Sequence, residues 1–304
     1  MRFFEISRVN TDALRSPEGL VRRCEEELTQ QICAAADRAL TAGAKARIIL
    51  LAGPSGSGKT TAAHALTHAL RQRGCGGRVL SMDDYFLPHS AGPLPVDENG
   101  DVDLESPDRL DRRLLREHLS QLQNGQCVAM PVFDFSCQER AQRTVAFRLQ
   151  DGERAVVEGI HALNPAVSGG IGLGVFADAD ISFRAPDGRI LTPQMLRLMR
   201  RILRDRLFRG RMPEDTLALF PSVSQGEQRY ILPHRDRAEV FISTGMAIEL
   251  GLYRTLLLPL LPEGGAHADL LATLRHFLQA ALPINPCLVP RRSFLREFIG
   301  AAGL

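Results

Sequence analysis

The sequence has no uncharged apolar run of membrane-spanning length. Its longest candidate, residues 255–261, is far shorter than the roughly 20 residues that a bilayer helix needs. Residues 1–8 contain no apolar signal core either. We therefore expect neither a membrane span nor export, and we place the protein in the cytoplasm.

Cysteine spacing and net charge exclude further classes of protein. The six cysteines form no C-x-x-C pair, which argues against a zinc knuckle or a disulfide framework and suits a reducing compartment. The formal charge of only +2 provides no overall basic field, so nucleic acid is not an expected partner. The chain also lacks internal repeats and low-complexity tracts, and its 304 residues can bury one large α/β core with appendages.

What the sequence does contain is a complete G-x-x-x-x-G-K-[ST] phosphate-binding motif at residues 53–60. Residues 47–52 before it have the pattern of a buried strand, and residues 61–70 after it that of a helix. This strand–loop–helix context disfavours a chance glycine-rich turn. Such a loop presents backbone amides and a helix N-terminus to phosphate oxygens. The expected ATP-binding residues are Gly53, Ser55, Gly56, Ser57, Gly58, Lys59, Thr60 and Thr61.

The rest of the chain alternates strand-like and helical segments, which predicts a doubly wound parallel α/β sheet. Further strands are expected at 78–82, 154–157, 175–183 and 239–243, with a hairpin of 127–135 and 144–149. Helices are expected at 18–42, 106–123, 193–209, 214–220 and 269–281, and a long loop at 89–103. Ligands of such sheets bind at the carboxyl ends of the strands, where the phosphate loop, Asp83 and Glu158 should meet.

Carboxylates and arginines supply the other groups that phosphoryl transfer needs. Asp83 follows the strand at 78–82 and either accepts the proton of an acceptor hydroxyl or caps a turn. Glu158 ends the strand at 154–157 and either supports Mg²⁺ or faces solvent. Residues 196–211 are dense in arginine, which indicates either a solvated charged face or a lid, hinged at Gly210, that closes over the phosphates.

Three further residues have open roles. Phe133 and Phe135 lie on a short apolar segment. We expect one ring to pack in the core and the other to stack on a planar base. His161 follows Glu158 closely and is either a site residue or a residue at the start of a helix.

Together these segments resemble the uridine kinase/phosphoribulokinase family of P-loop kinases between about residues 47 and 250. The matching segments are 53–61, 81–86, 104–108, 131–135, 157–160, 200–205 and 209–210. Residues 97–100 and the tail 288–300 are similar to those of long bacterial uridine kinase-like nucleoside kinases. Many of these carry a TGS and tRNA-synthetase-like region in front. Only about 45 residues precede the first core strand here, so we expect that region to be absent.

The resemblance implies an ATP- and Mg²⁺-dependent kinase that phosphorylates the 5′-hydroxyl of a nucleoside, with uridine or cytidine as the first guess. It implies that Asp83 is the general base and that Thr60 and Glu158 serve the metal. Lys59, Arg204 and Arg209 would stabilise the transferring phosphoryl group. The residues expected to bind the acceptor are Asp83, Tyr85, Phe86, Glu105, Phe133, Gln138, Arg201 and Arg211.

Two departures leave the acceptor open. Phe133 and Gln138 stand where well-studied cytidine/uridine kinases read the pyrimidine with a tyrosine and a histidine, and residues 184–193 resemble an insertion before the arginine-rich helix. One alternative is a phosphoribulokinase- or pantothenate kinase-like enzyme for another hydroxylated metabolite, although the loop 89–103 carries only acidic charges, which disfavours a phosphorylated acceptor. The other alternative is an ATP-binding regulator without catalysis.

The expected organisation has three parts. Residues 1–45 form an N-terminal helical extension, 46–262 a P-loop kinase domain with a β-hairpin acceptor subdomain and an arginine-rich helical lid, and 263–304 a C-terminal helical extension packed on the kinase core. The expected partner is a small-molecule nucleoside, without nucleic acid or membrane, and self-association into a homo-oligomer is a further expectation.

Overall fold

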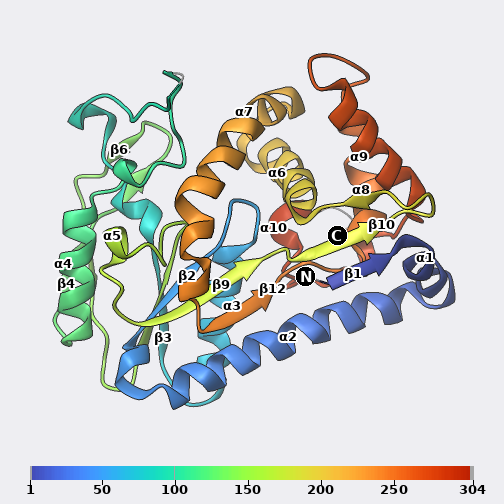
Figure 1. The fold of residues 1–304 in the computed structure, drawn as a ribbon. Coiled ribbons are helices and arrows are strands. Elements are labelled where there is room, and N and C mark those ends of the chain that lie inside the picture. The colour runs from blue at the N-terminus through green and yellow to red at the C-terminus, as the bar shows by residue number, and fades with distance from the viewer. Residues whose placement is uncertain (1, 99, 302–304) are drawn as a thin grey trace.

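The computed structural model describes residues 2–98 and 100–301, and a five-stranded sheet lies at its centre (Figure 1). The strands follow the order β12 (Val240–Ser243), β9 (Leu173–Asp178), β2 (Ile48–Ala52), β8 (Arg154–Glu158) and β3 (Gly77–Ser81). Every neighbouring pair is parallel. The predicted α/β class with a parallel sheet is therefore confirmed, and all five strand carboxyl ends lie along one edge.

Both faces of the sheet are buried, which explains why its strands are apolar throughout. Ile49 and Leu51 pack into one apolar core, and Ile48 and Leu50 into the other. The first core is covered by α2 (Pro17–Thr41) and α3 (Lys59–Gln72), and the second by α4 (Arg112–Gln123) (Figure 1). This alternation of side chains is the doubly wound arrangement.

The remaining elements lie around this sheet. Two short hairpins pair β4 (Val128–Met130) with β7 (Val145–Phe147), and β5 (Phe133–Asp134) with β6 (Glu139–Arg140). A second sheet joins β1 (Arg2–Glu5), β10 (Ile181–Arg184) and β11 (Ile190–Leu191). The other α-helices are α1 (Ile6–Arg15), α5 (Pro165–Ser168), α6 (Pro193–Arg209), α7 (Pro213–Gly226), α8 (Glu249–Leu256), α9 (Ala268–Ala280) and α10 (Arg296–Ile299).

Three details differ from the sequence prediction. The helix expected from residue 106 begins at Arg112, because Asp111 accepts a hydrogen bond from the Leu114 amide, whereas Ser106 caps only a 3-10 turn. The single strand expected at 175–183 is two strands, β9 and β10, in different sheets. Strand β1 was not predicted, because its hydrogen-bonding partner β10 lies far along the chain.

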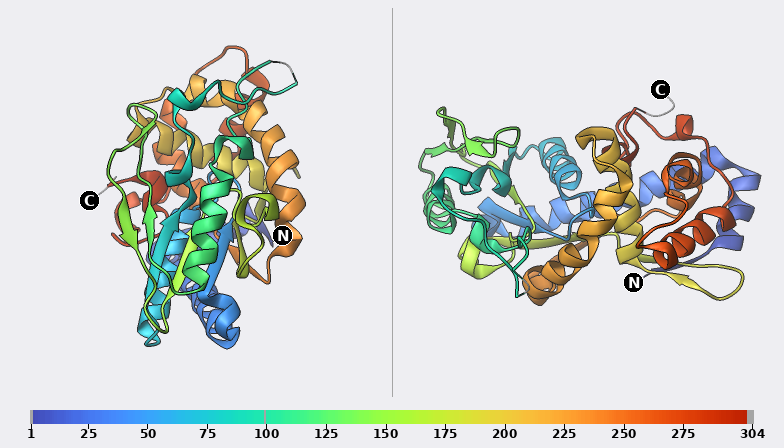
Figure 2. Two further views of the ribbon diagram at one scale, coloured as in Figure 1. Left: turned by 90° about the vertical axis from the view of Figure 1, so that its left-hand side faces the viewer. Right: turned by 90° about the horizontal axis from the view of Figure 1, so that it is seen from above.

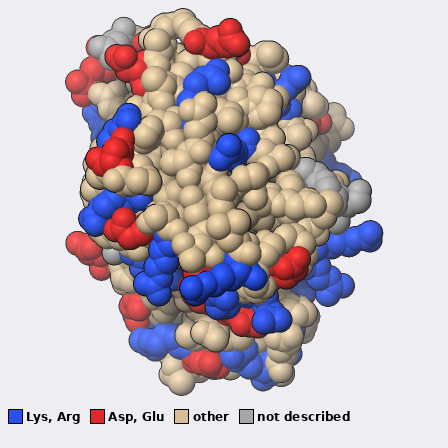
Figure 3. Space-filling model, turned by 90° about the vertical axis from the view of Figure 1, so that its right-hand side faces the viewer, with Lys and Arg blue, Asp and Glu red and all other residues tan. Residues whose placement is uncertain are grey.

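Helices α1 and α9, from the two ends of the chain, lie at one end of the molecule, opposite the end that carries α4 and the hairpins (Figure 1 and Figure 2). On the face that Figure 3 shows, charged side chains of both signs surround an uncharged centre. No helix within residues 2–98 and 100–301 is long and apolar enough to cross a bilayer. The three-part division at residues 45 and 262 stays a prediction, and residues 1 and 302–304 of its flanking parts lie outside the described residues, as does Asn99 of the resembling segment 97–100.

Candidate active site

The phosphate loop joins β2 to α3 at the carboxyl edge of the sheet. A Cβ atom at Gly53 would lie 2.0 Å from the carbonyl oxygen of Ala177, and one at Gly58 would lie 1.9 Å from the ring of Phe294. Both positions therefore require glycine for steric reasons. The Lys59 ammonium donates a hydrogen bond to the carbonyl oxygen of Pro54 at 3.0 Å, so the loop curls around this charge.

The serines and threonines in and just after the motif have different surroundings. Ser55 accepts a hydrogen bond from Arg201 at 2.7 Å. Ser57 is fully buried, and its hydroxyl has no hydrogen-bond partner within the described part of the chain. Thr60 is exposed at the start of α3, while Thr61 donates to Glu297 at 2.5 Å. Gly56 packs against the backbone of Arg197 on α6.

Two carboxylates from neighbouring strands lie beside the loop. Asp83 follows β3 and Glu158 ends β8, and Ser81, which pairs with Glu158 in the register of the two strands, donates to its Oε1 at 2.8 Å. Burial raises the pKa of Glu158, with Asp83 adding to the effect and Lys59 opposing it. Although Asp83 is exposed, the surrounding protein removes enough water to raise its pKa, against the charges of Lys59, Arg109 and Arg209.

Glu105 is the third carboxylate of the group. It is 8% exposed, and its Oε2 has no hydrogen-bond partner among residues 2–98 and 100–301. Burial raises its pKa, and the charges of Arg201, Lys59 and Arg109 oppose this rise. A Cβ at Gly226 would lie 2.4 Å from the Cβ of Glu105, so the C-terminal end of α7 covers this side chain. The long loop therefore brings Glu105 to the same centre as Lys59.

The arginines of α6 divide into a structural set and a set beside the phosphate loop. Arg200 is fully buried in a paired contact with Glu249, and Arg197 pairs with Asp178 and Glu227, so both belong to the scaffold. Arg201 faces the loop and Glu105.

The remaining predicted arginines gather on one buried carboxylate, Asp205. Arg204 and Arg209 contact its Oδ1 at 3.5 and 3.1 Å, and Arg211 contacts its Oδ2 at 3.6 Å. Gly210 ends α6 in the left-handed conformation at φ +63°, which turns the chain toward α7. A single acidic residue therefore organises the arginines at this corner.

The structure alters the roles expected for the aromatic residues. Tyr85 is fully buried and its hydroxyl contacts Nδ1 of His118 at 3.0 Å, so it is a core residue and not, as predicted, one that binds the acceptor. Phe133 is 7% exposed and packs edge-to-face against Phe86 and Phe135, with centroids 5.7 and 5.0 Å apart. Phe135, which we did not include in the site, is the exposed ring of the three at 54%.

Gln138, predicted to bind the acceptor, lies in the β5–β6 turn, where its side chain already has a partner. It has φ +57°, the one positive φ of a non-glycine residue within the described residues, and its amide donates to the carbonyl oxygen of Phe135 at 2.9 Å. Its main chain also ties the hairpin to the long loop, because its carbonyl oxygen accepts from His89 at 3.1 Å. In this conformation Gln138 shapes the β5–β6 turn.

Two further residues lie near these carboxylates: Arg109, which the sequence analysis missed, and His161, whose role it left open. Arg109 lies 4.6 Å over the ring of Phe86 and contributes positive charge to both Asp83 and Glu105. His161 is 2% exposed, and neither ring nitrogen has a hydrogen-bond partner in the described chain. Burial lowers the pKa of His161 to about 4, so its ring is neutral at physiological pH. A signal for His161 was its place three residues after Glu158, whereas nothing in the sequence singled out Arg109.

The oxygen donors beside the phosphate loop are of a kind that fits Mg²⁺. The Thr60 hydroxyl and the Glu158 carboxylate are hard oxygen donors of the kind that Mg²⁺ prefers, and Mg²⁺ in such sites takes its other ligands from substrate phosphates and water. No cluster of three or more histidine, cysteine, aspartate or glutamate side chains that could hold a metal occurs among the residues that the structure describes.

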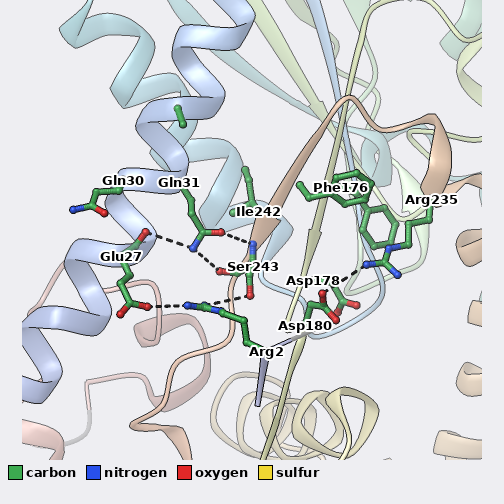
Figure 4. Close-up of a pocket in the computed structure, with 12 residues that line it drawn as sticks. Arg2, Glu27, Gln30, Gln31, Phe176, Asp178, Asp180, Arg235, Ile242 and Ser243 are labelled. Atoms are coloured by element: carbon green, nitrogen blue, oxygen red, sulfur yellow. Dashed lines mark hydrogen bonds and ion pairs between the residues drawn. The ribbon is translucent and has the colours of Figure 1, made fainter. Parts of the chain in front are cut away.

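A groove lies elsewhere, along the edge of β12 (Figure 4). It has a volume of about 660 Å³. Gln31 of α2 donates to and accepts from the backbone of Ser243, as a neighbouring strand would. Arg2 joins Glu27 to Ser243, and Arg235 points toward Asp180. Because these side chains satisfy one another, and because the groove is not lined by Lys59, Asp83, Glu105 or Glu158, this groove is not the candidate site.

Comparison with known proteins points to one family. Residues 48–249 match the model of the "Phosphoribulokinase / Uridine kinase family". The chain is 30% identical over 204 residues to a uridine kinase of Staphylococcus haemolyticus, covering 66% of this chain and 89% of that protein. It is 31% identical over 200 residues to a uridine kinase of Staphylococcus epidermidis, covering 65% and 87%. A D-glycerate 3-kinase structure from Cryptococcus neoformans has a TM-score of 0.49 at 14% identity, covering 71% of this chain and 97% of that one, which is too distant to inform function.

Proposed function

The chain belongs to the phosphoribulokinase/uridine kinase family, and we propose that it is an ATP- and Mg²⁺-dependent kinase that phosphorylates the 5′-hydroxyl of a nucleoside. The observation that carries the proposal is the group of three carboxylates, Asp83, Glu105 and Glu158, around the Lys59 ammonium. Burial lowers the pKa of Lys59, whereas the negative charge of each of these carboxylates raises it. All three are therefore close enough to Lys59 to interact with it electrostatically. Lys59 belongs to the phosphate loop, so an acceptor that contacts these carboxylates would also lie near the terminal phosphate.

Asp83 would act as the general base. Its exposed carboxylate follows β3 and lies near Lys59. A carboxylate in this place can accept the proton of the hydroxyl as the new O–P bond forms. The raised pKa of Asp83 makes it a stronger base than an ordinary aspartate.

Positive charge would balance the transferring phosphoryl group. Lys59 lies in the loop, and Arg204 and Arg209 stand at the end of α6, where Asp205 holds them. When bound, Mg²⁺ would neutralise phosphate charge, with the Thr60 hydroxyl and the Glu158 carboxylate as the protein groups that hold it and its waters. Closure of the α6–α7 corner would exclude water, which would otherwise accept the phosphate.

Glu105 and Arg201 would hold the acceptor. Glu105 has an unpaired Oε2 in a buried position, so a hydroxyl donor from a ribose would satisfy it. Arg201 already reaches the phosphate loop through Ser55. The ring cluster of Phe86, Phe133 and Phe135 offers an apolar surface for a planar base, and Phe135 is the ring accessible for stacking.

One observation favours a second acceptor class. Arg109 places a guanidinium beside Asp83 and Glu105, which is a cation on the acceptor side that the acidic loop did not predict. An acceptor that itself carries a phosphate or carboxylate would use such a charge. The alternative is therefore a kinase of another small hydroxylated metabolite.

The test is ADP release by the purified protein with Mg·ATP across a panel of nucleosides, ribulose 5-phosphate and pantothenate. Stimulation by one or two nucleosides is the expected result. If only an anionic acceptor stimulated ADP release, the result would favour the alternative, a kinase of another small hydroxylated metabolite. A protein that binds ATP tightly yet responds to no member of the panel would contradict the nucleoside assignment.

A further inference from the structure

The C-terminal segment, residues 293–300, lies against the phosphate loop although it falls outside the family match, which ends at residue 249. It contains α10, which packs against α6 near the centre of the molecule (Figure 1). The curated relatives align with about two thirds of this chain. The segment is therefore an addition to the shared kinase region, and its contacts with the loop need a reason.

Phe294 covers the last glycine of the loop. A Cβ at Gly58 would lie 1.9 Å from Cζ and 2.4 Å from Cε2 of this ring, so the ring rests directly on the glycine backbone. Gly58 has φ +78° and is the residue at which the loop becomes α3. A glycine there has more conformational freedom than any other residue, and a ring packed on it removes alternatives. Phe294 thus restricts the loop at a glycine in the left-handed conformation.

A buried arginine joins the same ring to the rest of the loop. Arg200 donates to the carbonyl oxygen of Gly56 at 3.1 Å and to both oxygens of Glu249 at 2.7 and 2.8 Å. Its guanidinium lies 5.5 Å from the ring centroid of Phe294 and 4.7 Å from that of Phe298. The loop backbone is therefore held from one side by Arg200 and from another by Phe294.

Two further contacts tie the segment to its surroundings. The Thr61 hydroxyl, in the first turn of α3, donates a hydrogen bond to the Glu297 carboxylate at 2.5 Å. Ser293 donates to Glu25 of α2, and its own hydroxyl accepts from the Leu295 amide at 3.0 Å. The segment therefore connects the N-terminal helix α2 to the loop, and both flanking parts of the chain bear on the nucleotide site.

We propose that Phe294 and Glu297 are positioning residues of the ATP site, which hold Gly58 and Thr61 ready for the triphosphate. This rests on the proposed binding of ATP by the loop. A loop that is already ordered loses less conformational entropy when the ligand binds, so its affinity is higher. Removal of these contacts should then weaken the binding of ATP and leave the acceptor side unchanged.

The test is calorimetric titration of the full-length protein with Mg·ATP, without any acceptor. Phe294→Ala is expected to weaken binding about tenfold or more. Phe298→Ala is the control, because this ring is also buried and also lies on Arg200 but is not the ring that covers Gly58. Phe294→Leu restores most of the side-chain volume and should recover most of the affinity. In turnover assays the KM for ATP should rise while the KM for the acceptor stays constant.

A second variant guards against poor folding of Phe294→Ala. Glu297→Ala removes the hydrogen bond from Thr61 and also a carboxylate charge that acts on Lys59. Loss of the hydrogen bond should weaken Mg·ATP binding about fivefold. Glu297→Gln removes the same charge but keeps an oxygen acceptor for Thr61, so it separates the two effects. The proposal would be overturned if Phe294→Ala and Phe298→Ala lost the same affinity for Mg·ATP. It would also be overturned if Phe294→Ala and Glu297→Ala both bound Mg·ATP as tightly as the wild type. A wild-type protein that does not bind Mg·ATP at all would instead refute the proposed function on which it rests.

Discussion

At the scale of single residues, Asp83 carries the chemical step of the proposed reaction. Asp83→Asn keeps the shape of the side chain but cannot accept a proton, so kcat should fall by about 10²- to 10⁴-fold. Mg·ATP binding should change little, because the phosphate loop is intact. The measurement is steady-state turnover with the best acceptor, alongside Mg·ATP titration. Turnover within about twofold of the wild type would remove Asp83 as the base.

His161 offers a different test, because it is a buried histidine whose ring has no side-chain partner among the described residues. His118 is also buried but contacts the hydroxyl of Tyr85 at 3.0 Å. An unpaired neutral ring near Glu105 can donate to and accept from an acceptor molecule, so His161→Asn should raise the acceptor KM about five- to thirtyfold and alter the preference among acceptors. His118→Asn should lower the Tm without changing the acceptor KM.

The same comparison can contradict the role of His161. If both variants lower the Tm and neither changes the acceptor KM or the order of preference, His161 is a core residue. Its pKa of about 4 adds a second check, since protonation of His161 should not appear in the pH profile of the acceptor KM near neutrality.

The buried charge of Glu105 should lower the stability of the folded protein at neutral pH. Burial raises its pKa above the ordinary 4.5, so the folded protein disfavours the charged form. The penalty is absent at low pH, where folded and unfolded states are both protonated, and it is complete at pH values above the raised pKa. Glu105→Gln should therefore raise the Tm by a few degrees at neutral pH and have little effect below pH 4.5, as thermal unfolding across pH would show. A lower Tm at neutral pH would contradict this sign.

At the scale of elements, the corner between α6 and α7 depends on Asp205. This fully buried carboxylate contacts Arg204, Arg209 and Arg211 and accepts from Thr216 at 3.3 Å. Asp205→Asn removes the charge that gathers these arginines, so kcat should fall about 10- to 100-fold as they lose their orientation. Thr216→Val breaks one contact of the corner and serves as the control for stability. Equal kcat in both variants and the wild type would show that the arginines do not need Asp205.

The elements also show where sequence reasoning succeeds and where it stops. Strand β2, the phosphate loop and α6 were predicted closely, because each has a local pattern: an apolar run, a glycine motif, or helical periodicity after Pro193. Strand β1 depends on pairing with β10, which no local pattern reveals. Likewise the burial of Tyr85 is decided by His118 on α4, a contact between separate elements.

In the candidate site too, residues within a sequence motif could be predicted, whereas features that depend on contacts between separate elements could not. Asp83, Glu105 and Glu158 were assigned from motifs, and the structure brings all three to Lys59, though their roles stay proposals. Which of two phenylalanines is accessible could not be read from the sequence, since exposure depends on how the hairpin packs against Phe86. Arg109 reaches the carboxylates because a 3-10 turn replaces the first turn of the predicted helix.

At the scale of the whole molecule, the phosphate loop is a junction between parts that are distant in sequence. Arg200 links it to Thr244 and Glu249 after β12, and Phe294 links it to the C-terminal segment, which Ser293 ties to α2. Segments from both ends of the chain therefore close around the loop. A ligand that orders the loop should stabilise the fold as a whole rather than one region of it.

The last prediction follows from this junction and concerns Mg·ATP and the unfolding of the whole chain. A ligand at 100 times its Kd stabilises the folded state by about 2.7 kcal/mol, which for a chain of this size corresponds to a Tm increase of roughly 4–5 °C. The shift should shrink when EDTA removes Mg²⁺ and disappear in Lys59→Ala, and tryptic cleavage near the C-terminus should slow in parallel with it. An equal shift with ATP in EDTA would exclude a metal requirement for binding. A shift that leaves C-terminal cleavage unchanged would show that the segment does not share in the stabilisation, because a segment coupled to the loop must gain protection whenever the loop does.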